Sequence, residues 1–327
     1  MNDLNTPVYI LMATFNGADF LAEQLDSLIA QIETRWILLI RDDGSVDDTV
    51  RIIKDYSQKD SRIYVQLNTG GSQSSVLDNF STLLVNAFER GAKYVFLCDQ
   101  DDVWAAGKLD EMLTHMKQVE GIECKPCLIH HDLEVVNESL EVIADSFIKL
   151  MQLKPSDQCN PQRLISRNEV TGCAMACNRS LLEIALPVSN QAVMHDWWLA
   201  LCAGYFGRLT FLPKKLVKYR QHGSNAIGAK SFWHALNPFT NWITGWRRGN
   251  KDFVESVEQA RAFRDARFSR FDKESESFAA LELYCGLVAA TRWQRLTALR
   301  ECGLWRSHWL LNVVMVMRML LLSRESD

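Results

Sequence analysis

The first hundred residues alternate short apolar runs with helical patterns, and this alternation restricts the chain to a small set of folds. The strand candidates cover residues 8–13, 36–40, 63–67 and 94–98. Between the first two, apolar residues repeat at spacings of four and three, as on one face of a helix: Leu21, Leu25, Leu28 and Ile32. The pattern predicts an α/β fold with a mostly parallel central sheet flanked by helices.

Length and composition narrow the class of protein further. With 327 residues, the chain can form one large domain or two modest ones, and 47% hydrophobic with 23% charged residues excludes a disordered chain. No apolar run reaches the length of a transmembrane helix, and the N-terminus lacks the pattern of a secretory signal. The cysteines lie mostly inside apolar stretches, which is typical of reduced, buried thiols. We therefore expect a cytoplasmic protein.

The last hundred residues differ from the rest of the chain. From Gly228 onward there are 15 basic and 11 acidic residues, whereas the remainder has 21 basic and 29 acidic residues. Six of the ten tryptophans also lie in this last part. We expect an α/β domain over 1–227 and a helical C-terminal region over 228–327.

Three helices are expected in the C-terminal region, over 252–271, 278–299 and 309–322. The first would place four apolar residues on one side: Phe253, Val257, Ala260 and Phe263. The third is strongly apolar but too short to span a bilayer. Two interpretations stay open for this region. It forms a peripheral anchor on the inner face of the cytoplasmic membrane, or it packs on the α/β domain or builds a homodimer.

Polar side chains follow three of the expected strands at their carboxyl ends. The segments that carry them are Thr14-Phe15-Asn16, Asp42-Asp43 and Asp99-Gln100-Asp101-Asp102, in which Phe15 is the one apolar residue. Because the carboxyl ends of parallel strands meet at one edge of a sheet, we expect these residues on one rim, where ligands bind. The gathered carboxylates would repel one another without a cation, and Mg²⁺ or Mn²⁺ suits such an oxygen-rich site. Asp47 and Asp48 are expected instead to cap a helix.

Some functional classes are excluded by the same segment. The first strand is not followed by the Gly-x-Gly-x-x-Gly fingerprint of dinucleotide-binding domains, and no phosphate-binding Walker loop is present. An acidic rim repels phosphates in the absence of a metal, so nucleic acid is not an expected partner.

The ordered set of motifs resembles the family 2 glycosyltransferases, which have the GT-A fold. The resemblance covers residues 7–225, and within the family it is greatest to bacterial rhamnosyltransferase-type enzymes of surface polysaccharide synthesis. The motifs are Thr14-Phe15-Asn16-Gly17, Asp42-Asp43-Gly44-Ser45, Asp99-Gln100-Asp101-Asp102-Val103-Trp104, Thr171-Gly172-Cys173, His195-Asp196-Trp197-Trp198 and Tyr219-Arg220-Gln221-His222-Gly223-Ser224-Asn225.

On the donor side, the resemblance implies a nucleotide-sugar site with a divalent cation. Asp43 would bond the nucleotide base, and the turn from Thr14 to Asn16 would pack around base and ribose. Asp101 and His222 would hold Mn²⁺ or Mg²⁺. The remaining expected nucleotide-sugar contacts are Asp99, Asp102 and Arg220, and for Arg220 an ordinary polar loop is an equally good interpretation.

On the acceptor side, the resemblance implies that Asp196 is the general base of an inverting transfer. Gly172 would permit a close approach of backbone to the acceptor, and Trp197 and Trp198 would offer flat surfaces for a sugar ring. The alternative is that Asp196 caps a helix and the tryptophans belong to the core.

Together these expectations describe a metal-dependent glycosyltransferase. It would move a sugar from dTDP-rhamnose or a UDP-sugar to a saccharide or lipid-linked saccharide in the synthesis of bacterial O-antigen, capsule or exopolysaccharide. One alternative is a non-catalytic sugar-nucleotide-binding or scaffold subunit of a polysaccharide assembly complex. Another is a metal-dependent phosphohydrolase, which would not need the tryptophan-rich acceptor motif.

Overall fold

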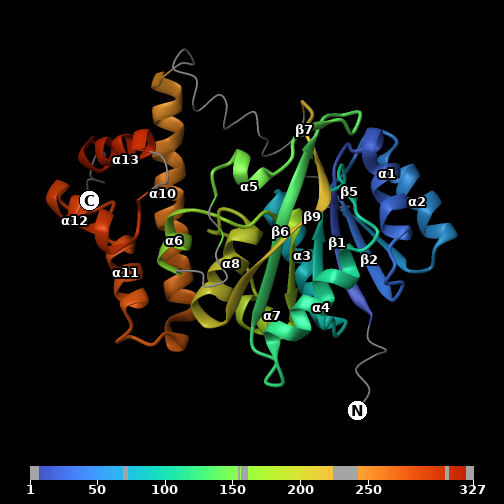
Figure 1. Ribbon diagram of the computed structural model, residues 1–327, viewed down its shortest axis with the longest axis horizontal. Helices are drawn as coiled ribbons and strands as arrows, with labels where there is room; N and C mark the ends of the chain where they lie inside the picture. The colour runs from blue at the N-terminus through green and yellow to red at the C-terminus, as the bar shows by residue number, and fades with distance from the viewer. Residues whose placement is uncertain are drawn as a thin grey trace.

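The computed structural model describes residues 7–68, 73–153, 155, 161–223, 242–305 and 309–321. Its centre is one nine-stranded sheet with the order β3-β2-β1-β4-β8-β6-β9-β5, and β7 pairs with β6 outside this path (Figure 1). The strands are β1 (Val8–Thr14), β2 (Trp36–Asp42), β3 (Ile63–Leu67), β4 (Tyr94–Cys98), β5 (Val103–Trp104), β6 (Cys127–Val136), β7 (Val142–Ala144), β8 (Met175–Asn178) and β9 (Arg208–Arg220).

The four strands expected from the first hundred residues all form. The strands β3, β2, β1 and β4 run parallel, and Thr14 lies in register with Asp42 at the carboxyl ends of β1 and β2. Beyond β4 the sheet is mixed: β8 runs antiparallel to both β4 and β6, whereas β6 and β9 are parallel. The parallel half therefore sets up the shared rim that the sequence predicted.

Helices cover both faces of the sheet and bury two apolar layers. One face carries α1 (Ala18–Ile29), α2 (Thr49–Lys59) and α4 (Lys108–Glu120). The other carries α3 (Val76–Glu89), α7 (Arg179–Ala185) and α8 (His195–Phe206). In α1, Leu21, Leu25 and Leu28 are fully buried, but Ile32 lies beyond the end of the helix and is 69% exposed. The predicted periodicity thus extends one turn too far.

Short segments connect the second half of the sheet to the site. They include α5 (Phe147–Leu150), α6 (Pro161–Ser166) and a 3₁₀ turn over Gly172–Ala174. The turn leads directly into β8, and β9 ends at Arg220, two residues before His222.

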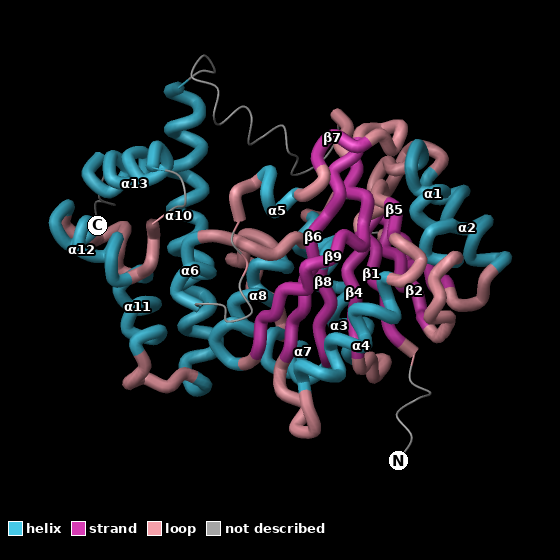
Figure 2. Tube along the Cα trace, viewed as in Figure 1, coloured by secondary structure: helices cyan, strands magenta, loops and turns pink. Residues whose placement is uncertain are grey.

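The C-terminal helices stack beside α6 and α8 at one end of the molecule (Figure 2). They are α10 (Trp242–Arg267), α11 (Glu276–Cys285), α12 (Arg292–Glu301) and α13 (Trp309–Leu321), with a 3₁₀ turn over Phe268–Arg270. The expected inner face of the first of these helices is correct, because Phe253, Val257, Ala260 and Phe263 are all buried.

The expected helix over 278–299 is instead two helices, α11 and α12. Cys285 ends α11, and Thr291 begins α12 with a capping box in which its side chain and that of Gln294 satisfy each other's backbone N–H groups. No helix in the described part of the chain is long and apolar enough to cross a membrane. The proposed domain boundary at 227, Ser224 and Asn225 lie outside the described residues.

Candidate active site

A cavity of about 880 Å³ opens at the carboxyl ends of β1 and β4, where the predicted rim lies. It brings together nine of the residues that the sequence singled out, from segments up to 208 positions apart. They are Thr14, Phe15, Asn16, Asp43, Asp99, Asp101, Gly172, Asp196 and His222.

The turn after β1 is fixed by hydrogen bonds to the two neighbouring strand ends. Thr14 Oγ1 donates to Asp42 Oδ1 at 3.0 Å, and Asp42 also accepts from the backbone N–H groups of Gly44 and Ser45. The Phe15 backbone exchanges hydrogen bonds with the Gln100 side chain at 2.9 and 3.1 Å. The Asp42 side chain thus accepts hydrogen bonds that stabilise this turn, although the sequence places it on the predicted ligand-binding rim.

Asn16 and Asp47 also hold this turn in place. Asn16 has a left-handed backbone (φ 45°), and its Oδ1 accepts from the Val46 N–H at 2.9 Å. Asp47 accepts from the backbone N–H groups of Ala18 and Thr49, the first residues of α1 and α2, which agrees with the capping role expected for it. Asp48 occupies the N-cap of α2, but its side chain makes no capping hydrogen bond and pairs with Arg51 instead.

Asp43 is held as a carboxylate at one end of the cavity. Its Oδ1 accepts from Asn68 Nδ2 at 2.8 Å and from the Ser74 N–H at 3.0 Å. Burial alone would raise the pKa of Asp43, but the hydrogen bonds from Ser74 and Asn68 outweigh it and the pKa lies below its ordinary value. A charged acceptor at this position can bond the N–H groups of a nucleotide base.

Asp99 and Asp101 line the cavity. Asp101 Oδ2 lies 2.7 Å from Nε2 of His222, so the two side chains expected to hold a cation are in direct contact. Burial, together with the nearby Asp101 and Asp196, raises the pKa of Asp99 to about 7. A cation beside these carboxylates would relieve their mutual repulsion.

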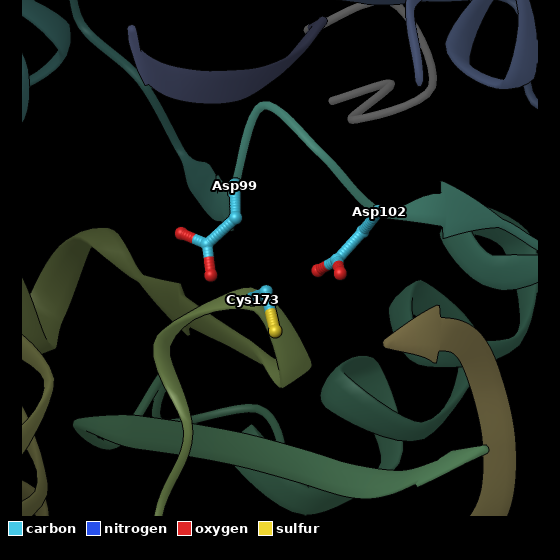
Figure 3. A group of neighbouring side chains, drawn as sticks. All are labelled: Asp99, Asp102 and Cys173. Atoms are coloured by element: carbon cyan, nitrogen blue, oxygen red, sulfur yellow. The ribbon is translucent and has the colours of Figure 1, made fainter. Parts of the chain in front are cut away.

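Asp102 and Cys173 lie beneath the cavity rather than on its wall. Figure 3 shows Asp99 and Asp102 pointing toward a common space beside Cys173, and ligand atoms of the three lie within 4.8 Å of one another. Asp102 is fully buried and accepts from the Arg220 N–H at 3.0 Å. Within the described part of the chain, Lys108 is the only lysine buried in this space. Its Nζ donates to the Cys173 carbonyl at 2.6 Å.

The residues on the cavity wall fit a hard divalent cation better than the buried trio does. Carboxylate oxygen is the ligand that Mn²⁺ and Mg²⁺ prefer in sites completed by phosphate, and Asp101 supplies it on the cavity wall, with His222 Nε2 2.7 Å away. Cys173 does not, because burial raises the pKa of its thiol well above the ordinary value and keeps the sulfur protonated.

Asp196 lies on the cavity wall in the first turn of α8. Its Oδ1 accepts from Asn168 Nδ2 at 3.0 Å and from the Trp197 N–H at 2.6 Å. Burial raises the pKa of Asp196 to about 7, against the opposing effect of hydrogen bonds from Trp197, Gly172 and Asn168. A carboxylate with this pKa can take up a proton near neutral pH.

Because Gly172 has no side chain, it leaves room beside Asp196 on the cavity wall. A Cβ atom on Gly172 would lie 3.3 Å from His195 Nε2 and 3.7 Å from an oxygen of Asp196. His195 is buried and stacks on Phe80 with ring centroids 4.1 Å apart.

Four of the expected site residues do not line the cavity: Asp102, Arg220, Trp197 and Trp198. Trp198 is fully buried and donates to the Ala185 carbonyl at 2.8 Å, and Trp197 donates to the Leu164 carbonyl at 2.6 Å. Both rings therefore belong to the core, as the alternative interpretation held, and offer no surface to a sugar.

Arg220 is likewise a buried structural residue. Its guanidinium pairs with Glu23, donates to the Glu138 carbonyl and to the Asp101 carbonyl at 2.8 Å, and lies 4.5 Å from the ring centre of Phe20. It anchors the loop that carries Asp101, so it can reach a phosphate only by giving up these bonds.

Sequence reasoning missed three residues that the geometry makes prominent: Lys108, Arg167 and Asn168. Asn168 has a signal that could have been used, because it stands three residues before the Thr171-Gly172-Cys173 motif. Lys108 and Arg167 lie outside the motifs and have no local pattern of their own.

The sheet, the acidic rim and the cavity together define a nucleotide-sugar transferase of the GT-A type. Residues 9–183 match the model of "Glycosyl transferase family 2", which is more than half of the chain. The chain therefore belongs to glycosyl transferase family 2, and it is a glycosyltransferase.

Curated relatives agree with this assignment. The chain is 24% identical over 226 residues to dTDP-rhamnosyl transferase RfbG of Shigella flexneri, covering 67% of this chain and 74% of that protein. It is 30% identical over 112 residues to the putative teichuronic acid biosynthesis glycosyltransferase TuaG of Bacillus subtilis, covering 34% and 42% of the two chains.

Solved structures share the fold at low sequence identity. Residues 1–349 of S. aureus TarS, in complex with UDP-GlcNAc, align with a TM-score of 0.54 and 14% identity, covering 89% of this chain and 83% of that one. The mannosyltransferase PcManGT of Pyrobaculum calidifontis, in complex with GDP-Man and Mn²⁺, aligns with a TM-score of 0.52 and 16% identity, covering 98% and 82%.

Proposed function

We propose that this glycosyltransferase works by inversion, with Asp196 as its general base. Asp196 takes the proton of an acceptor hydroxyl while that oxygen forms a bond to the anomeric carbon of the donor sugar. The bond from this carbon to the diphosphate oxygen breaks, and its electron pair leaves with the nucleoside diphosphate. Attack from the face opposite the diphosphate inverts the anomeric centre.

The observation that carries this proposal is the proximity of Asp196 to the carboxylates that follow β4. Asp196 is near enough to help raise the pKa of Asp99, and its own pKa is raised to about 7 by burial. A base and a donor-side carboxylate thus share one cavity, and the base has the pKa that proton transfer at neutral pH requires.

The donor end of the cavity supports a nucleoside diphosphate. Asp43 bonds the base, the turn over Thr14 to Asn16 packs around base and ribose, and Asp99 faces the ribose. Asp101 and His222 would hold Mn²⁺ or Mg²⁺. When bound, this cation would act as a Lewis acid that stabilises the charge developing on the leaving diphosphate.

We infer dTDP-rhamnose or a UDP-sugar as the donor and a saccharide or lipid-linked saccharide of a bacterial surface polysaccharide as the acceptor. The names of RfbG and TuaG support this inference. For lipid-linked acceptors the enzyme would work at the inner face of the cytoplasmic membrane. The exposed rings of Trp293, Trp305 and Trp309 on and beside α12 and α13 are suited to such a surface.

The test is a thermal-shift panel of nucleoside diphosphates and sugar nucleotides, with and without Mn²⁺. It compares the wild type with Asp101→Ala. Asp48→Asn is the control, because Asp48 is exposed and pairs with Arg51 at the surface. We expect one nucleotide to stabilise the wild type and Asp48→Asn in the presence of metal, and Asp101→Ala to lose this shift. The absence of any nucleotide-dependent shift in the wild type would overturn the proposal.

Product analysis then separates the alternatives. A transferase makes a glycoside only when an acceptor is present, whereas a phosphohydrolase releases sugar phosphate or nucleotide without one. A scaffold subunit binds the sugar nucleotide but forms neither the glycoside nor the hydrolysis product.

A further inference from the structure

Arg167 is a cation on the cavity wall that forms no ion pair within the described part of the chain. It lines the cavity, and it makes no hydrogen bond or ion pair with any residue in the part of the chain that the structure describes. Burial lowers the pKa of its guanidinium, but an arginine keeps its charge throughout the physiological range. Arg167 is half-buried, and a positive charge that is partly withdrawn from water costs free energy that an anion would offset.

Glu169 compensates this charge only in part: it acts to raise the pKa of Arg167, but burial outweighs it and the pKa lies below its ordinary value. Glu169 Oε1 accepts from Arg163 Nη2 at 2.7 Å, and the Glu169 side chain is only 6% exposed in this pair. Arg163 also repels Arg167, because both are positive. Within its described surroundings, Arg167 thus lines the cavity with a charge that its neighbours neutralise only in part.

The position of Arg167 assigns it to the acceptor end of the cavity. The next residue, Asn168, donates to Asp196 Oδ1 at 3.0 Å, so the segment that carries Arg167 is bonded to the proposed base. The donor end is marked by different segments, with Asp43 bonded to Asn68 and Ser74. We take the anion that meets Arg167 to lie on the same molecule as the hydroxyl that meets Asp196.

We propose that Arg167 binds an oxyanion of the acceptor, so that the acceptor of this enzyme is an anionic saccharide. The inference rests on the proposed function, which makes Asp196 the base for the acceptor hydroxyl. A guanidinium can bond two oxygens of one phosphate or carboxylate at once, which positions the acceptor as well as holding it. A phosphate in the acceptor's lipid linkage and the carboxylate of a uronic acid both supply such a group.

The experiment compares three probes that share one alkyl chain and one sugar ring. They are decyl glucoside, which is neutral, decyl glucuronide, which adds a carboxylate, and decyl diphosphoglucose, which adds a diphosphate. Binding of each probe is measured by isothermal titration calorimetry below its micelle concentration, with and without a nucleoside diphosphate and Mn²⁺. We expect at least one anionic probe to bind the wild type more tightly than the neutral one by roughly 10- to 100-fold.

Variants at Arg167 then assign this preference to its side chain. Arg167→Gln should remove the preference and Arg167→Lys should keep part of it, because lysine retains the charge but not the two-point contact. Arg179→Gln is the control, since Arg179 pairs with Glu183 and does not line the cavity. Whether the carboxylate or the diphosphate probe gains identifies the source of the oxyanion.

The possible contrary results are distinct. The proposal is overturned if neither anionic probe binds more tightly than decyl glucoside, or if the preference survives in Arg167→Gln. It is also overturned if Arg167→Gln weakens nucleoside diphosphate binding instead, because Arg167 would then belong to the donor site. Unchanged nucleotide-dependent thermal shifts in Arg167→Gln show that the variant is folded. Failure of the proposed function is a separate result, because it appears as the absence of nucleotide binding to the wild type.

Discussion

The Nζ atom of Lys108 lies 2.6 Å from the carbonyl oxygen of Cys173, in a space that excludes water. The ammonium group also lies 3.5 Å from the ring centre of Trp104, and burial lowers its pKa to about 8. Asp99 and Asp102 are near enough to oppose that decrease. One lysine at the start of α4 therefore ties the acidic loop after β4 to the turn that carries Gly172.

We expect Lys108→Met to lower the free energy of unfolding by about 2 kcal/mol, because the buried Cys173 carbonyl loses its donor. Methionine keeps the length of the side chain, so the change isolates the ammonium group. Urea unfolding measures the effect, and Lys125→Met is the control because Lys125 pairs with Glu123 at the surface. Equal stability of Lys108→Met and the wild type would show that the Lys108–Cys173 contact does not stabilise the fold.

Asp196→Asn should lower kcat/KM by roughly 1000-fold, because asparagine cannot take a proton from the acceptor. In the wild type, kcat/KM should fall about tenfold per pH unit below the pKa of about 7 that burial gives Asp196. Binding of the nucleoside diphosphate should be unchanged. Retention of wild-type turnover in Asp196→Asn would remove this residue from the mechanism.

The same pKa gives a stability test that does not depend on activity. Because the pKa of Asp196 is higher in the folded state than its ordinary value of 3.8, the folded chain binds more protons between these values. The contribution of Asp196 to the free energy of unfolding is therefore greatest at low pH, where the side chain is protonated. It decreases as the pH rises toward 7 and the buried side chain ionises. Asp196→Asn lacks this loss, so its stability relative to the wild type should increase from pH 4 to pH 7 in urea titrations.

The sequence alone predicted the rim because strand ends are encoded locally. An apolar run followed by Thr14 or by Asp99 marks both the strand and the edge at which it ends, and parallel pairing brings these ends together. The Asp196 position also follows from a local motif, and the cavity contains it.

For the expected site residues that do not line the cavity, the direction of the side chain depends on partners far away in the sequence. Arg220 pairs with Glu23, 197 positions earlier, and Trp198 packs edge-on against Phe263 with ring centroids 5.6 Å apart. A motif places a residue near the site but does not say whether its side chain faces the cavity or the core. Lys108 was missed for the same reason, since its partner Cys173 lies 65 positions away.

Gly172→Ala should lower kcat/KM by roughly 10- to 100-fold with little change in nucleoside diphosphate binding. The added Cβ would lie 3.3 Å from His195 Nε2, so either the imidazole or the turn must shift beside Asp196. Gly107→Ala is the matched control, because its Cβ would meet only Glu111 at 3.6 Å. Steady-state kinetics with saturating donor measure the effect, and equal kcat/KM in both variants would show that the turn tolerates a side chain.

Phe263→Ala should lower the free energy of unfolding by about 4 kcal/mol, although Phe263 belongs to the C-terminal region. Its ring is fully buried on α10 and contacts Trp198, Tyr205 and Phe206 on α8, with ring centroids 5.4 to 5.8 Å apart. Because α8 also carries Asp196, the C-terminal helices and the catalytic part of the chain share one apolar core.

We therefore expect a single cooperative unfolding transition in which both regions unfold together. Tryptophan fluorescence and the loss of nucleotide binding both monitor this transition. Trp293→Ala is the control, since this side chain is 79% exposed and its loss should change stability by less than about 0.5 kcal/mol. Two separate transitions, with Phe263→Ala shifting only one of them, would instead show that the region over 228–327 folds as an independent domain. The buried contacts between α8 and α10 predict the first result, because losing one region would expose the apolar face of the other to water.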